Sequence, residues 1–222
     1  TSSPSSSPSS SPTASLSSSP TVTPTASPTP ATDYLAETPT TSPTVSAPAS
    51  STSLSISLNQ GWTWISFNVA MSDMSIRTVF QSISTLGSGD FIKNQLDFTD
   101  YYEGYGFYGQ LTALTSGEMF AVKLLQSPAT LTVSGTPVAL PMTVTMNAGW
   151  TWLPCPYQTA QPLRTGAPAS SAVPYTNGDQ FKSQNQFSEY YAGYGWYGTL
   201  TTIEPGSGYK AKTASGGARR FG

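Results

Sequence analysis

The stretch Leu54-Ser-Ile-Ser-Leu-Asn-Gln-Gly-Trp-Thr-Trp-Ile65 decides the fold, because it occurs twice. It returns 88 residues later as Met142-Thr-Val-Thr-Met-Asn-Ala-Gly-Trp-Thr-Trp-Leu153. A second block, residues 89–109, returns as residues 178–198 at an offset of 89. Duplication at this period indicates two copies of one structural unit. We therefore expect two modules, residues 53–140 and 141–222.

Each copy begins with apolar residues that alternate with serine or threonine, which predicts a strand with one buried face. A turn at Asn-Gln-Gly or Asn-Ala-Gly then predicts a hairpin whose second arm holds both tryptophans. Pro154 predicts that the second hairpin ends early. Residues 129–140, with turn residues at 134–137, predict a connecting hairpin between the copies. The expected fold class is all-β, in two small sandwich- or barrel-like modules.

A single helix is expected, in the first copy. Ile76, Val79, Phe80 and Ile83 share one face of a helical pattern over residues 75–86. The equivalent residues 161–176 contain three prolines, so they cannot form a continuous helix.

The residues that precede the modules have a different composition. Of residues 1–52, 39 are Ser, Thr or Pro, so the segment buries too little apolar surface to fold alone. We expect an extended, O-glycosylated arm. Tyr34 and Leu35 are its expected anchor on another surface. The candidate O-glycosylation sites are Ser5, Ser9, Thr21, Thr23, Thr25, Thr29, Thr41 and Thr44.

Composition excludes several function classes. The chain has 9 Lys+Arg, 11 Asp+Glu and no histidine, so neither nucleic-acid binding nor a histidine-based metal or catalytic site is expected. No apolar run is long enough to span a bilayer. The lone Cys155 is expected to be a small buried residue, with an intermolecular disulfide as the open alternative. We expect no cofactor and no enzymatic activity, because the copies repeat no carboxylate pair.

The repeated aromatic runs are the main candidates for a contact surface. Glycines at 104, 106, 193 and 195 imply tight exposed loops whose tyrosines cannot all point inward. The two tryptophan pairs are interpreted mainly as core, with sugar stacking as the alternative. Asp90 and Asp179 are expected to stabilise turns, with glycan contact left open. The candidate contact or glycan-binding residues are Tyr101, Tyr102, Tyr105, Tyr108, Tyr190, Tyr191, Tyr194, Trp196, Tyr197, Asp90 and Asp179.

The Gly-Trp-X-Trp block, the Gly-Asp-X-Ile/Phe-Lys-X-Gln block and the Tyr-Tyr-X-Gly-Tyr-Gly run together resemble repeats of large secreted and cell-surface proteins of bacteria and some algae. The resemblance covers both modules and not the arm. It implies an extracellular or cell-surface setting with an adhesive or structural role, and it implies no catalytic residues.

Two functions follow as expectations. The first is a structural subunit of a glycosylated extracellular filament, which grows by self-association if the modules meet head to tail. The alternative is a carbohydrate-binding adhesin module on a glycosylated stalk. That alternative predicts that Trp196 or Tyr194 is exposed beside Gln184 or Asp179.

Overall fold

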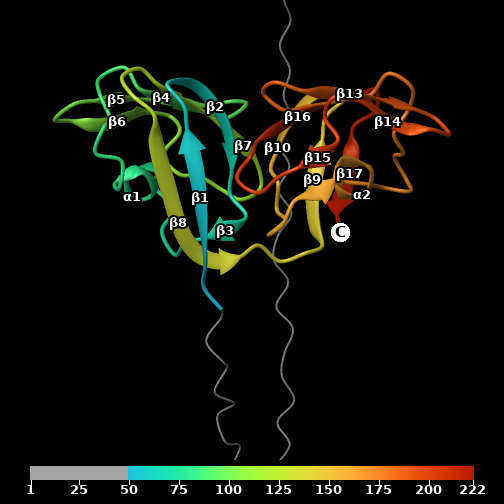
Figure 1. Ribbon diagram of the computed structural model, residues 1–222, viewed down its shortest axis with the longest axis horizontal. Helices are drawn as coiled ribbons and strands as arrows, with labels where there is room; N and C mark the ends of the chain where they lie inside the picture. The colour runs from blue at the N-terminus through green and yellow to red at the C-terminus, as the bar shows by residue number, and fades with distance from the viewer. Residues whose placement is uncertain (1–49) are drawn as a thin grey trace, which may run out of the picture. The chain divides into compact units, whose positions relative to one another are not determined.

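The first strand of each module forms as its alternating pattern predicts. In the computed structural model, which describes residues 50–222, β1 (Thr52–Leu58) buries its leucines and isoleucine and exposes its serines. It pairs antiparallel with the long strand β8 (Ala129–Pro137), which also pairs with β3 (Val69–Ala70). Figure 1 shows β1 and β8 side by side in the first module.

The predicted connecting hairpin at residues 129–140 is wrong, because β8 is one continuous strand. Gly135 has a different role from the turn that its sequence context indicates. A Cβ atom there would clash with the carbonyl oxygen of Ala70. The glycine therefore allows β3 to approach β8 closely.

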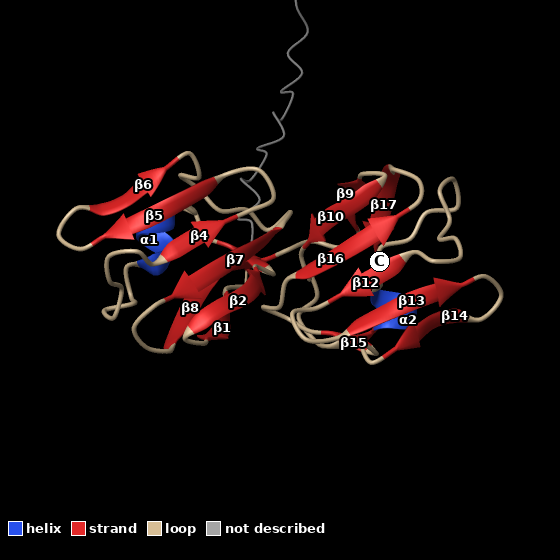
Figure 2. Ribbon diagram, turned by 90° about the horizontal axis from the view of Figure 1, so that it is seen from above, coloured by secondary structure: helices blue, strands red, loops and turns tan. Residues whose placement is uncertain are grey.

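A five-stranded antiparallel sheet forms the second layer of each module (Figure 2). In the first module its order is β2 (Gly61–Ser66), β7 (Met119–Leu124), β4 (Phe91–Lys93), β5 (Phe98–Tyr102) and β6 (Gly106–Gly109). In the second it is β10 (Gly149–Leu153), β16 (Tyr209–Thr213), β12 (Gln180–Lys182), β13 (Phe187–Tyr191) and β14 (Gly195–Gly198). β10 is one residue shorter than β2, which confirms the early end predicted from Pro154.

The smaller layer of the second module pairs β9 (Met142–Met146) with β17 (Gly217–Phe221), as β1 pairs with β8. A short pair, β11 (Gln161–Pro162) with β15 (Thr202–Ile203), completes the described strands. The all-β fold with two homologous modules is thus present, and each module encloses its own core of apolar side chains between its layers.

Two short helices occupy equivalent places in the modules. α1 (Ile76–Phe80) buries three of the four residues of its predicted apolar face, and Ile83 is buried just beyond its end. The helix is shorter than residues 75–86 because serines and threonine follow it. A second short helix, α2 (Leu163–Gly166), forms in the second module, beyond the one helix expected, and it is a single turn because the prolines around it prevent a longer one.

The two modules meet through reciprocal glutamine contacts. The Gln95 side-chain amide donates to the backbone carbonyl of Trp150 over 3.0 Å and accepts from the backbone N–H of Trp152 over 2.9 Å. Gln184, the equivalent of Gln95, makes the same two bonds to Trp62 (2.6 Å) and Trp64 (3.1 Å). Each glutamine thus covers the open edge strand of the other module's sheet.

This exchange of equivalent contacts is that of a pseudo-two-fold interface, which closes on itself. Several contacts that are made in one direction only break the symmetry. Ser66 N–H donates to the Gly206 carbonyl over 2.9 Å, but its equivalent, Pro154, has no N–H to donate. Because the glutamine contacts are reciprocal, the modules do not meet head to tail.

Candidate functional site

The Tyr-Gly run of each module forms a hairpin tip that projects one tyrosine into solvent. In the first module Gly104 and Gly106 have φ values of +79° and +94°, which favour glycine and place Tyr105 at the apex of the turn. The Tyr105 N–H donates to the Tyr102 carbonyl over 3.0 Å. Ser88 accepts a bond from the Glu103 N–H, so the tip is also anchored to a neighbouring loop.

The second module repeats this tip. Gly193 and Gly195 have φ values of +83° and +94°, and Tyr194 is bonded like its equivalent. Asn177 replaces Ser88 as the acceptor for the backbone N–H. Tyr105 and Tyr194 are 74% and 73% exposed, so neither ring is part of the core of its module.

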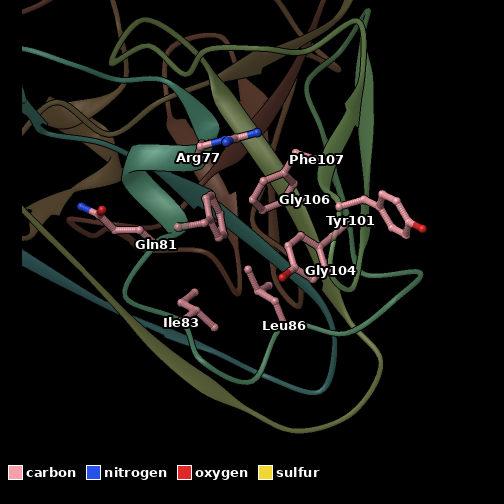
Figure 3. A pocket seen from close by; sticks show the side chains of 10 residues that line it. Arg77, Gln81, Ile83, Leu86, Tyr101, Gly104, Gly106 and Phe107 are labelled. Carbon is pink, nitrogen blue, oxygen red and sulfur yellow. The ribbon is translucent and has the colours of Figure 1, made fainter.

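Beside each tip lies a pocket between the hairpin and the short helix. The first has a volume of about 380 Å³. Its lining includes Arg77 from α1, Tyr101 and Phe107 from the hairpin strands, and Tyr105 from the tip. Figure 3 shows Arg77 and Phe107 toward one end and Ile83 and Leu86 toward the other.

The second pocket, of about 360 Å³, shares part of this lining. Arg164, Tyr190, Tyr194 and Trp196 occupy the places of Arg77, Tyr101, Tyr105 and Phe107. Tyr175 adds a wall that the first pocket lacks, with its ring 4.8 Å from that of Trp196. We call these two sites the paired pockets.

The arginines were not among the residues singled out from the sequence. The signal for them is the match of Ile76-Arg-Thr with Leu163-Arg-Thr at an offset of 87, inside the segment where the copies diverge most. Two identical residues and one similar residue among prolines and gaps are too few to detect without knowing that α1 and α2 lie in equivalent places. Structural equivalence thus extends the repeat into this segment.

The candidate tyrosines divide into two groups. Tyr101, Tyr105, Tyr190, Tyr194 and Trp196 line the paired pockets. The remainder lie on the outer faces of the five-stranded sheets, where each is about half exposed, and they pair edge to face within a module. These are Tyr102, Tyr108, Tyr191 and Tyr197.

Asp90 and Asp179 stabilise turns and do not face a ligand. Asp90 is 2% exposed and accepts bonds from the Gly87 and Leu125 N–H groups. Asp179 is 3% exposed and accepts the two equivalent bonds. The interpretation as turn residues is confirmed, and the alternative of glycan contact does not fit two buried carboxylates.

Tyr194 is exposed as the carbohydrate-binding alternative predicts, but its expected neighbours are elsewhere. Gln184 lies at the junction of the modules, and Asp179 is buried. Trp196 is half-buried and contacts Tyr175, Phe181 and Tyr190. Its ring therefore contributes to the fold as well as to the pocket.

The tryptophan pairs do point to one face, but that face is not the core. Thr63 and Ile65 face inward, while Trp62 and Trp64 lie on the outer surface of the sheet. Trp62 and its equivalent Trp150 are 39% and 38% exposed. The sequence pattern fixes the alternation but not its direction, and the small β-branched Thr63 takes the inward position.

Lysines stack on these outward tryptophans at the junction. Lys210 lies 4.1 Å from the centre of the Trp64 ring and 4.2 Å from that of Trp152. Lys93 also reaches across, with its Nζ 5.6 Å from the Trp152 ring. These cation–π contacts link the modules.

Cys155 is fully buried, as expected, and burial raises the pKa of its thiol to about 12. Within residues 50–222, no group of three acidic, histidine or cysteine side chains could hold a metal ion. None of the helices in that part of the chain is long and apolar enough to cross a membrane.

The expected arm, its O-glycosylation sites from Ser5 to Thr44 and its anchor Tyr34 and Leu35 lie outside the described residues. No protein-family model, curated protein or solved structure matches the chain.

Proposed function

We propose that this protein is a carbohydrate-binding module with two equivalent sites, the paired pockets. Aromatic rings recognise sugars by stacking on the apolar face of a pyranose ring, while polar groups bind the hydroxyls. Tyr105 and Tyr194 offer exposed rings, and Arg77 and Arg164 offer hydrogen-bond donors to the same pockets.

One observation carries the proposal: the arginine of each pocket is repeated inside a segment where the two modules otherwise differ. The arginine, both tyrosines and both glycines are identical in the two modules, and the sixth position is Phe107 or Trp196. The tyrosines and glycines belong to hairpins that are repeated throughout, whereas the helical segments around the arginines differ, with Val79 and Phe80 in one and Gly166 and Ala167 in the other. A common binding function accounts for this selective repetition.

Two sites on one chain favour binding to polymers or to surfaces with many sugar groups. The second site then binds at a raised effective concentration, which increases overall affinity without new contacts. This suits an adhesive role outside the cell, which remains part of the proposal.

The filament expected from the sequence remains a prediction with less support. It depended on a head-to-tail contact between the modules that could continue to the next chain. The reciprocal glutamine contacts use the open edges of β2 and β10 within one chain, so this contact does not propagate.

A glycan array with purified protein tests the proposal. We expect binding that Tyr105→Ala or Tyr194→Ala weakens by at least tenfold on a dense surface, and that the double variant abolishes. Tyr108→Ala with Tyr197→Ala is the matched control, because these residues are 57% exposed but lie on the sheet faces. The absence of any bound glycan, or an equal loss in the control, would contradict the proposal.

A further inference from the structure

The junction of the modules contains a groove that is separate from the paired pockets. It has a volume of about 370 Å³ and is lined by Trp64, Trp150, Trp152, Lys182 and Lys210. The side chains come from β2 and β10 at the edges of the two sheets, from β16 beside β10, and from β12 on the other side of β16. The groove is complete only when both modules are present.

Positive charge is concentrated in this groove. Lys210 lies between the Trp64 and Trp152 rings, and the Lys182 Nζ lies 5.4 Å from the Trp150 ring. Lys93 approaches the same Trp152 ring. Tryptophan faces attract ammonium groups but do not neutralise their charge.

The lysines also act on one another. Burial, followed by the charges of Lys93 and Lys182, lowers the pKa of Lys210, and no carboxylate of the described residues opposes this shift. A cluster of like charges on an open surface attracts anions. An anionic ligand would relieve the repulsion among the three ammonium groups.

The fold itself does not require Lys210. The equivalent position of the first module is Ala121, which occupies the same place in β7 that Lys210 occupies in β16. The positive charge at this position is therefore specific to the second module, where it faces the junction. Alanine is sufficient for the fold at the equivalent position, so binding explains the charge of Lys210 better than packing does.

We propose that the junction groove binds an acidic polysaccharide, with a sugar ring on the exposed face of Trp150 and its sulfate or carboxylate groups beside Lys182 and Lys210. Two features favour this ligand over a small anion. The three indole rings provide flat apolar surface, which a sugar ring uses and an inorganic ion does not. The groove also crosses from one module to the other, which suits a chain of several sugars.

Dextran sulfate and unsulfated dextran of equal length are suitable probes, because they share one backbone and differ in their sulfate groups. Isothermal titration with the whole chain should show binding to dextran sulfate that weakens as salt increases. Lys210→Ala should reduce this affinity at least tenfold, and Lys182→Ala with Lys210→Ala should abolish it. Arg220→Gln removes one exposed positive charge on β17 and should change the affinity less than twofold.

Lys210→Met separates charge from packing. The methionine keeps an apolar chain between the Trp64 and Trp152 rings and loses only the cation–π attraction, so the protein should remain folded at the temperature of the titration while the affinity falls as in Lys210→Ala. In a background of Tyr105→Ala with Tyr194→Ala, which removes the exposed rings of the paired pockets, Lys210→Ala should still reduce the affinity for dextran sulfate at least tenfold, and this distinguishes the groove from the paired pockets.

Four results would overturn the proposal. The first is no binding of dextran sulfate, and the second is an equal loss in Arg220→Gln and Lys210→Ala. The third is displacement by inorganic sulfate at the same sulfate concentration and ionic strength, which would indicate a simple anion site. The fourth is binding of oligodeoxythymidylate at least as tight as that of dextran sulfate and equally sensitive to Lys210→Met, which would indicate single-stranded nucleic acid.

Discussion

Arg219 lies in the second module where Leu131 lies in the first. Arg219 is opposite Val144 in the β9–β17 pair, as Leu131 is opposite Ile56 in the β1–β8 pair, and both side chains are fully buried. The guanidinium group lies 4.1 Å from the Tyr175 ring, but its nitrogens have no hydrogen-bond partner among the described residues. A charged group has thus taken a core position that suits leucine.

Replacing this arginine by leucine should stabilise the protein. A buried charge without hydrogen bonds costs several kcal/mol, and apolar replacement of buried charges commonly stabilises by about 1–4 kcal/mol. We expect Arg219→Leu to raise the free energy of unfolding by an amount in this range, measured by urea denaturation. Leu131→Arg is the converse variant and should destabilise the first module; a loss of stability in Arg219→Leu would contradict this account.

The glutamines at the junction should stabilise the contact between the modules. Gln95→Ala and Gln184→Ala each remove two hydrogen bonds to an edge strand, at about 0.5–1.5 kcal/mol per bond. We expect each variant to lower the free energy of unfolding by about 1–3 kcal/mol. Gln186→Ala, an exposed glutamine for which the described residues show no hydrogen bond across the junction, serves as a control in thermal unfolding. Equal effects at Gln184 and Gln186 would argue against the reciprocal contact.

The buried thiol predicts a loss of stability at alkaline pH. The pKa of Cys155 in the folded protein is about 12, against 9.0 for the free group, so the unfolded chain loses this proton first. Stability is therefore fully present below about pH 9 and falls as the pH rises toward 12. The loss from this one group should reach about 1.4 kcal/mol by pH 10.

Cys155→Ala should flatten this dependence between pH 8 and pH 10 in urea denaturation. Burial also raises the pKa of Tyr157, Tyr175 and Tyr209, so the variant should still lose stability at higher pH. Identical curves for wild type and variant up to pH 10 would mean that the thiol is not buried as described.

The sequence predicts the strands well because the duplication doubles each signal. The alternation at Leu54, Ile56 and Leu58 is repeated at Met142, Val144 and Met146. Both segments form the predicted strands, β1 and β9, each in an antiparallel pair. The last strand escaped detection because β8 and β17 share little sequence: Leu131 and Val133 correspond to Arg219 and Phe221. The two strands are recognised as equivalent only because β8 pairs with β1 and β17 pairs with β9.

The site was predictable in part. Glycines beside Tyr105 and Tyr194 indicate exposed turns, and both side chains are exposed. The direction in which Trp62 and Trp64 point depends on which face of the strand packs on the core, and alternation alone leaves that open. The junction depends on contacts between residues more than 50 positions apart, such as Gln95 and Trp152, which no local pattern encodes.

The central proposal, two equivalent sugar sites on one chain, is tested most directly by the stoichiometry of binding. Isothermal titration with a short neutral oligosaccharide identified on the array should give two sites per chain for the wild type. It should give one site for Tyr105→Ala or Tyr194→Ala, and none for the double variant. A stoichiometry that stays the same in all three variants would contradict the proposal.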